Sequence, residues 1–220
     1  MRVGAHIDAL RKSVPQDVTI VAVSKFHPSA MIREAYDSGQ RIFGESRVQE
    51  LVAKQQELPE DIQWHFIGGL QRNKVKQIAP FISLIHSLDS ERLMLEIEKQ
   101  GAAYNRVIPC LLQIHIASEE TKSGFSPDEC RQFLSDGKWR ECRHVQIAGV
   151  MGMATFTENE EHIRNEFRLL KSLFEEFKAA YFSEESAFKE RSMGMSGDYP
   201  VAIDEGSTMV RLGTVIFGER

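Results

Sequence analysis

The segment Val18-Thr-Ile-Val-Ala-Val-Ser-Lys25 sets the pattern that the rest of the chain repeats. Its β-branched, apolar run is typical of a buried strand. Phe26-His27-Pro28 breaks this run, and a stretch of helical character follows over residues 29–38. A strand that leads at once into a helix is the repeating unit of α/β folds with parallel strands.

The same alternation continues along the chain. After the first strand, we expect strands at 41–43, 63–67, 84–86, 108–116, 145–150, 190–193 and 209–212. We expect helices at 4–12, 29–38, 47–56, 72–79, 90–104, 127–136, 159–177 and 199–205. This alternation matches a (β/α)8 barrel, whereas an open doubly wound sheet usually has only about five or six strands. The prediction is therefore an α/β protein in which residues 1–220 form a single TIM-barrel domain with an extra N-terminal helix.

The composition limits the classes of protein that fit. The chain has 220 residues, of which 42% are hydrophobic and 27% charged, as is ordinary for a soluble globular protein. Its net charge of −5 gives no bulk attraction to nucleic acid or to an anionic membrane. No apolar run approaches the ~18 residues that mark a membrane-spanning helix. We therefore expect neither a nucleic-acid partner nor a membrane partner.

The cysteines and histidines argue against a disulfide framework and against a metal site. Cys110, Cys130 and Cys142 are odd in number and form no C-x-x-C pair, which favours unpaired thiols in a reducing cytoplasm. The first residues lack the apolar core of a signal peptide. The histidines show no H-E-x-x-H pattern and no clustering with cysteine, so no metal ion is expected.

Lys25 is the first candidate for chemistry. At the end of a buried strand, its aliphatic stem lies in apolar surroundings and its amine stands at a rim. Such an amine is suited to form Schiff bases with carbonyl compounds, among them pyridoxal phosphate. The alternative is an ordinary surface lysine that closes the strand. The residues at the other strand ends bear on the choice.

Unusual side chains also follow most of the other predicted strands. They are Gly44-Glu-Ser46, Gly68-Gly-Leu-Gln-Arg-Asn-Lys74, His86-Ser87, Met151-Gly-Met153, Met193-Gly-Met-Ser196 and Gly213-Thr214. In a barrel the C-terminal ends of the strands share one face, and that face carries the active site. So many clusters on one face are hard to explain as turns alone, which favours a functional site there.

The last two clusters suggest a phosphate site. Barrels commonly bind phosphate with the loops after strands seven and eight. Glycine-rich turns let backbone N–H groups approach the phosphate oxygens, and Ser196 and Thr214 add hydroxyl groups beside Gly213. Either pair alone would read as an ordinary turn. Because strands one and eight are neighbours in a closed barrel, a phosphate here lies within reach of a group bonded to Lys25.

Arg211, two residues before Gly213, is on the same face of the predicted strand. A buried arginine needs a hydrogen-bonding or charged partner inside the barrel. One candidate is the nitrogen of a bound pyridine ring, which an arginine would leave unprotonated. A neutral pyridine is a poor electron sink, and this limits carbanion chemistry. The other candidate partner is a barrel glutamate such as Glu45.

Two further sets of residues are open to more than one interpretation. Met151, Met153, Met193 and Met195 either pack on a flat ring or fill the top of the barrel. Lys122 is either a second rim lysine or a solvated loop charge. Its segment lacks the full nucleotide P-loop pattern, so a nucleotide site is not expected.

These residues occur in stretches that resemble a known family. The stretches are Val21-Ala-Val-Ser-Lys25, Phe43-Gly-Glu-Ser-Arg-Val-Gln-Glu50, Trp64-His-Phe-Ile-Gly-Gly-Leu-Gln-Arg-Asn-Lys74, His86-Ser-Leu-Asp89, Lys122-Ser-Gly124, Gly149-Val-Met-Gly-Met153, Ser192-Met-Gly-Met-Ser-Gly-Asp198 and Gly206-Ser-Thr-Met-Val-Arg-Leu-Gly-Thr-Val-Ile-Phe-Gly218. In content and order they resemble the pyridoxal phosphate homeostasis protein family, which is also described as alanine-racemase-like.

The resemblance implies a barrel that holds pyridoxal 5′-phosphate as an internal aldimine on Lys25. It implies phosphate contacts from Ser196, Gly213 and Thr214, and Arg211 at the ring nitrogen. We add Ser46 and Met151 to the expected cofactor-binding residues; at Ser46 the family usually has asparagine. The family is thought to buffer and deliver the cofactor, so pyridoxal-phosphate-dependent apoenzymes are possible partners. We expect a cytoplasmic monomer or weak dimer.

Two alternative functions would also use Lys25 as the reactive amine. A racemase or lyase would use the same cofactor, but a racemase needs two bases on opposite faces of the substrate carbon. The related alanine racemases bring the second base from another domain, and we expect this chain to end just after strand eight. An aldolase-type barrel would instead use Lys25 without a cofactor and the phosphate site for a sugar phosphate. We favour cofactor storage and delivery over turnover.

Overall fold

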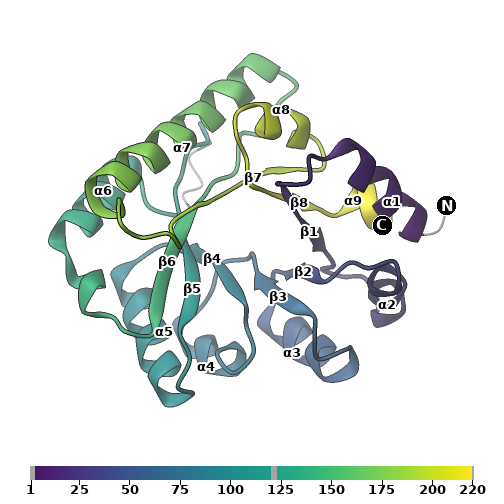
Figure 1. The fold of residues 1–220 in the computed structure, drawn as a ribbon, viewed down its shortest axis with the longest axis horizontal. Coiled ribbons are helices and arrows are strands. Elements are labelled where there is room, and N and C mark those ends of the chain that lie inside the picture. Colours follow the sequence, from purple (N-terminus) through teal and green to yellow (C-terminus); the bar gives the residue numbers. More distant parts are fainter. Residues whose placement is uncertain (1–2, 120–122, 220) are drawn as a thin grey trace.

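Eight parallel strands close into a barrel in the computed structural model, which describes residues 3–119 and 123–219 (Figure 1). The strands are β1 Thr19–Val23, β2 Ile42–Glu45, β3 Gln63–Phe66, β4 Leu84–Leu88, β5 Ile108–Gln113, β6 Val145–Met151, β7 Glu190–Met195 and β8 Met209–Leu212. Each strand pairs with the next, and β8 pairs with β1. The predicted TIM barrel is confirmed. Lys122 lies outside the described residues.

Helices form a ring around the strands, as Figure 1 shows. They are α1 Val3–Ser13, α2 Ser29–Asp37, α3 Val48–Glu57, α4 Val75–Ile78, α5 Glu91–Ala103, α6 Pro127–Asp136, α7 Glu160–Tyr181, α8 Tyr199–Asp204 and α9 Thr214–Phe217, with 3-10 turns η1 Arg72–Lys74 and η2 Lys138–Glu141. Two differ from the sequence-based expectation. Helix α7 runs on to Tyr181, and α9 follows β8 although four residues are too few for a periodic signal. Helix α1 lies beside α9, where the His6 ring contacts the Ile216 carbonyl at 2.8 Å.

The two faces of each strand enter different cores, because successive side chains point to opposite sides. The inner cluster consists of Val21, Leu84, Leu111, Ala148, Met151 and Met209, with Ile42 packed against it. These residues come from six different strands and fill the barrel interior. The strands are thereby joined to one another as well as to the helices.

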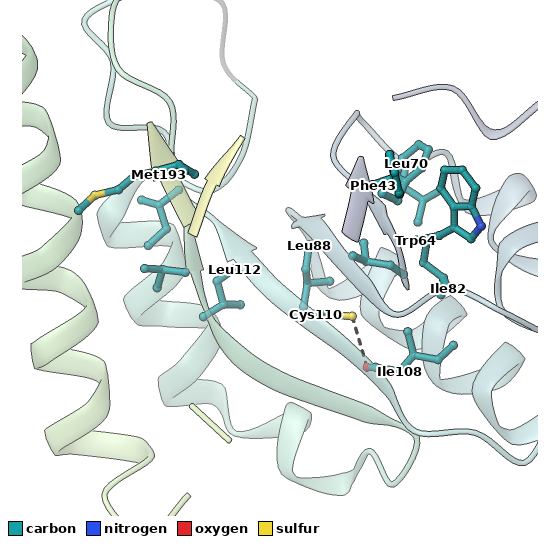
Figure 2. Close-up of a cluster of buried hydrophobic side chains, with 14 of the residues drawn as sticks. Phe43, Trp64, Leu70, Ile82, Leu88, Ile108, Cys110, Leu112 and Met193 are labelled. Atoms are coloured by element: carbon teal, nitrogen blue, oxygen red, sulfur yellow. Dashed lines mark hydrogen bonds between the residues drawn. The ribbon is translucent and has the colours of Figure 1, made fainter. Parts of the chain in front are cut away.

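The outer core lies between the strands and the helices. Figure 2 shows part of it: Phe43, Trp64 and Leu70 lie together, and the Cys110 thiol points to the Ile108 carbonyl. Burial raises the pKa of the Cys110 thiol far above its usual value and that of Cys130 to about 12. The thiols of both residues therefore stay protonated at neutral pH, away from solvent.

The described residues bear on three of the expected absences. All three cysteines are free. Within residues 3–119 and 123–219, no helix is long and apolar enough to cross a membrane. Over the same ranges, no three His, Cys, Asp or Glu side chains are grouped as metal ligands.

Gly149 in β6 has a φ of 150° and pairs with Glu190 of β7. A Cβ at this position would stand 1.9 Å from the Glu190 carbonyl oxygen. We expect Gly149→Ala to lower the free energy of unfolding by at least ~3 kcal/mol, because backbone atoms must move apart. Chemical denaturation measures this loss. Gly69→Ala is the control, since a Cβ there meets nothing within 4 Å; equal losses in the two variants would contradict the explanation.

Candidate functional site

A cavity of about 810 Å³ opens at the C-terminal ends of the strands. Its volume is within the range typical of small-molecule sites. Six of the seven residues predicted to bind a cofactor line it, namely Lys25, Ser46, Ser196, Arg211, Gly213 and Thr214. Residues that were more than 150 positions apart in the sequence are therefore brought together, as the barrel topology requires.

Strand alternation explains how Lys25 reaches the cavity. Val21 belongs to the inner cluster, and Val23 and Lys25, two and four residues further along, line the cavity wall. Lys25 is half-buried. On β2, Ile42 packs against the inner cluster, and Ser46 reaches the cavity in the same way.

Strand β8 supplies the adjacent part of the cavity wall by the same rule. Met209 lies in the inner cluster, and Arg211 and Gly213 line the cavity above it. The ladder between β1 and β8 pairs Val21 with Arg211. This register places the end of β1, where Lys25 stands, beside the end of β8.

Arg211 is 4% exposed and its guanidinium is held by strand β7 and the end of β6. It donates to the Ser192 carbonyl at 2.9 Å, to the Ser192 hydroxyl at 2.6 Å and to the Gly152 carbonyl at 3.0 Å. Burial lowers the pKa of Arg211 to about 10, so the side chain stays charged at neutral pH. These bonds use three of the roughly five N–H donors of a guanidinium, which leaves donors for a ligand in the cavity.

The alternative prediction, that Arg211 pairs with Glu45, is wrong. Glu45 follows Phe43 on the outward face of β2, so it points to the helices and away from the barrel interior. Its carboxylate accepts hydrogen bonds from Lys54 Nζ of α3 at 2.7 Å and from the Ser24 hydroxyl at 2.6 Å. Burial raises the pKa of Glu45, and the bonds from Lys54 and Ser24 oppose that rise.

Two histidines continue the hydrogen bonds of Arg211 across the barrel interior. The Ser192 hydroxyl meets His86 Nδ1 at 3.0 Å, and His86 Nε2 meets His65 Nδ1 at 3.0 Å. Arg211 can only donate, so the Ser192 hydroxyl accepts from it; we assign the Ser192 proton to His86 Nδ1, and His86 then donates from Nε2 to His65. Each histidine is then neutral with its proton on Nε2. A polar layer thus lies between the inner apolar cluster and the cavity.

The phosphate end predicted from the sequence consists of two loops that touch. The Gly213 N–H donates to the Ser196 hydroxyl at 3.2 Å. Thr214 begins α9 and is exposed beside them. A Cβ at Gly197, which also lines the cavity, would meet no protein atom within 4 Å. The fold therefore does not require glycine at 197, whereas a ligand that approaches the backbone would.

The methionines divide into two pairs. Met153 and Met195 line the cavity. Met151 is 1% exposed in the inner cluster and Met193 is buried in the outer core. Met151 does not line the cavity, because its place inside β6 turns it into the packed interior.

Several cavity residues carried no sequence prediction. They include His27, Ile67, Phe156 and Asp198. Asp198 accepts a hydrogen bond from the Met195 N–H at 2.5 Å, and burial raises its pKa. The signals available for Asp198 were its position two residues after Ser196 and its place in the family-like stretch that ends at Asp198. Phe156 lies in the loop after β6, where no periodic pattern marks a residue as lining a cavity.

The comparison with known proteins identifies the family. Residues 2–220 match the family model "Alanine racemase, N-terminal domain". The chain is 41% identical over 202 residues to the pyridoxal phosphate homeostasis protein of Aquifex aeolicus. This match covers 91% of this chain and 86% of the relative. The chain therefore belongs to the pyridoxal phosphate homeostasis protein family, within the alanine racemase N-terminal domain family.

Solved structures agree with this assignment. PipY of Synechococcus elongatus matches in a structure without pyridoxal phosphate, at 36% identity and a TM-score of 0.91, and in one with it bound, at 35% and 0.89. Both matches cover 98% of this chain and 100% of the other. An alanine racemase from Bartonella henselae is 18% identical with a TM-score of 0.70, over 99% of this chain and 58% of the racemase, and shares the fold.

His65 and His86 make stability depend on pH. Burial lowers the pKa of His65 to about 3, and burial, together with unfavourable electrostatics from His65 and Arg211, lowers the pKa of His86 well below its usual value. In the unfolded chain both take up a proton below pH ~6.5, and in the folded chain they do not. His65 should therefore cost about 1.4 kcal/mol of stability per pH unit from pH ~6.5 down towards ~3, and His86 should add a loss of the same sign below pH ~6.5. Imidazole ¹⁵N shifts, measured from pH 7 to 5, should stay those of neutral rings with the proton on Nε2. Protonation of either ring near pH ~6.5 would contradict this.

Proposed function

We propose that the cavity holds pyridoxal 5′-phosphate covalently on Lys25 and that the protein stores and delivers this cofactor in the cytoplasm. One observation carries the proposal: a lysine, a buried arginine with unused donors and a phosphate-type loop pair line one cavity. The names of its relatives and the PipY structure with pyridoxal phosphate bound support it. We further propose that residues 1–220 act as one domain.

Arg211 fits the ring nitrogen of this cofactor. A pyridine nitrogen is a hydrogen-bond acceptor, and the guanidinium retains donors after its bonds to Ser192 and Gly152. Its charge is held rigidly by β7, which leaves little freedom to move away. An arginine gives up its proton reluctantly, so it would keep the ring nitrogen unprotonated. That state makes the ring a weak electron sink, which favours storage over turnover.

The loops after β7 and β8 fit the phosphate group. Ser196 and Thr214 offer hydroxyl groups, and the backbone at Gly197 is open to close approach, since a Cβ there would meet no protein atom within 4 Å. Short polar side chains and backbone N–H groups are the usual ligands of a phosphate in a barrel. A sugar phosphate would satisfy the same loops, and the experiment on Lys25 separates the two ligands.

Lys25 provides the attachment. When bound, the cofactor supplies an aldehyde that condenses with a primary amine and releases water. Because this bond is reversible in water, a protein that makes it can release the intact cofactor. We propose pyridoxal-phosphate-dependent apoenzymes as the recipients.

Lys25→Ala tests the covalent attachment. Wild-type protein mixed with pyridoxal 5′-phosphate should gain a visible absorption band, and borohydride should then fix a reduced pyridoxyl phosphate on the peptide that contains Lys25. Lys25→Ala should lose both signals, because Lys25 is the only lysine that lines the cavity among residues 3–119 and 123–219. Lys99→Ala, at an exposed position on α5, is the control and should keep them. A wild-type protein that stays colourless and unlabelled would refute the proposal.

Storage and delivery need a second readout of the same proteins. Loaded wild-type protein should restore activity to an apo-aminotransferase in the presence of a phosphatase that destroys free cofactor. Turnover of amino acids above the rate of free cofactor, lost in Lys25→Ala, would instead favour a racemase or lyase.

Ser196→Ala tests the phosphate end of the cavity. The variant loses one hydroxyl contact to a charged ligand, so we expect about tenfold weaker binding of pyridoxal 5′-phosphate. Pyridoxal, which has no phosphate, should bind both proteins within about twofold of each other. Ser135→Ala, an exposed serine on α6, provides the comparison in titration calorimetry. Equal weakening for both ligands would place the phosphate elsewhere.

A further inference from the structure

The peptide groups on both sides of Lys25 are bound to helix α3. The carbonyl of Ser24, just before Lys25, accepts a hydrogen bond from Lys54 Nζ at 2.8 Å. The N–H of Phe26, just after it, donates to Glu50 Oε1 at 2.6 Å. Lys25 is therefore held by two contacts that do not involve its own side chain.

The two contacts belong to one ion pair. Lys54 Nζ and Glu50 Oε1 are 2.6 Å apart, one helical turn from each other on α3. The same ammonium also bonds Glu45 Oε1 at 2.7 Å, and only 7% of the Lys54 side chain is exposed. Removing a charge from water costs free energy, so a buried ammonium persists where several acceptors surround it. Here the acceptors come from the ends of β1 and β2 and from α3.

The backbone at Phe26 shows why such support is needed. Phe26 has a φ of 67°, in the left-handed region that residues with a side chain rarely adopt. The Arg47 guanidinium lies 4.7 Å from the centre of its ring. Unfavourable backbone geometry persists when surrounding contacts determine it, and it is common at ligand sites. The bond from Phe26 to Glu50 is such a contact, directly beside Lys25.

We propose that Glu50 and Lys54 are positioning residues that set where the Lys25 amine stands and thereby strengthen its covalent bond to the cofactor. Neither belongs to the described residues that line the cavity, so neither is placed to contact a ligand. The ion pair acts on the backbone that carries Lys25 and leaves the ring and phosphate contacts alone. This inference rests on the proposed function.

The distinction gives a direct test with two ligands. Pyridoxal 5′-phosphate carries the aldehyde that reacts with an amine, whereas pyridoxine 5′-phosphate carries an alcohol in its place and binds without a covalent bond. The dissociation constant of pyridoxine 5′-phosphate divided by that of pyridoxal 5′-phosphate measures what the covalent bond adds to affinity. Glu50→Ala should reduce this ratio about tenfold, because one charge-assisted hydrogen bond is lost, while pyridoxine 5′-phosphate binds within about twofold of wild type.

Two further variants complete the experiment. Glu50→Gln keeps an oxygen for the Phe26 N–H but loses the charge, so its ratio should fall between those of wild type and Glu50→Ala; it also provides the test if the alanine variant does not fold. Glu57→Ala removes an exposed carboxylate from the same helix and should leave the ratio unchanged.

The possible outcomes are separable. A ratio that does not change in Glu50→Gln and Glu50→Ala overturns the positioning role, as does equal weakening of both ligands, which would mean a general disturbance of the cavity. If wild-type protein binds neither ligand, the proposed function itself fails.

Discussion

The ladder between β1 and β8 is the constraint on which the site depends. It pairs residues 19–22 with residues 209–212 and closes the sheet into a barrel. Lys25 follows one of these strands directly, and Gly213 follows the other. In an open sheet with the same sequential strand order, the first and last strands would lie at opposite edges, and the amine would be far from the phosphate-type loops. Closure turns two distant pieces of sequence into the two ends of a single cavity.

The inward and outward faces of the strands form different parts of the structure around the site. The inward faces build an apolar layer, then the polar layer of His65, His86, Ser192 and Arg211, and then the cavity. The outward faces support the site from behind, where Glu45 meets the buried ammonium of Lys54. Charged side chains therefore lie on both sides of the strands: Arg211 is bonded inside the barrel, and Lys54 and Glu45 are paired outside it. Such preorganised contacts fix ligand-binding groups before a ligand arrives.

Strand order and the residues at strand ends could be predicted because β-branched runs and glycine clusters are local signals. Six of the predicted cofactor residues line the cavity for this reason. The errors arose from the strand face. Glu45 was a candidate partner for Arg211, and β2 was expected to end at residue 43. The strand continues to Glu45, and alternation turns this side chain outward. Met151 points inward, but it lies within β6 in the inner apolar cluster and does not line the cavity. The contacts of Lys54 with Ser24 and Glu45 depend on how α3 packs, which no local pattern reveals.

A crystal structure of the protein loaded with pyridoxal 5′-phosphate is the most direct measurement. It should show continuous density from Lys25 Nζ to the cofactor, the phosphate against Ser196, Gly213 and Thr214, and the ring nitrogen within hydrogen-bond distance of Arg211. Cofactor density joined to another lysine, or a phosphate bound away from the ends of β7 and β8, would contradict this arrangement.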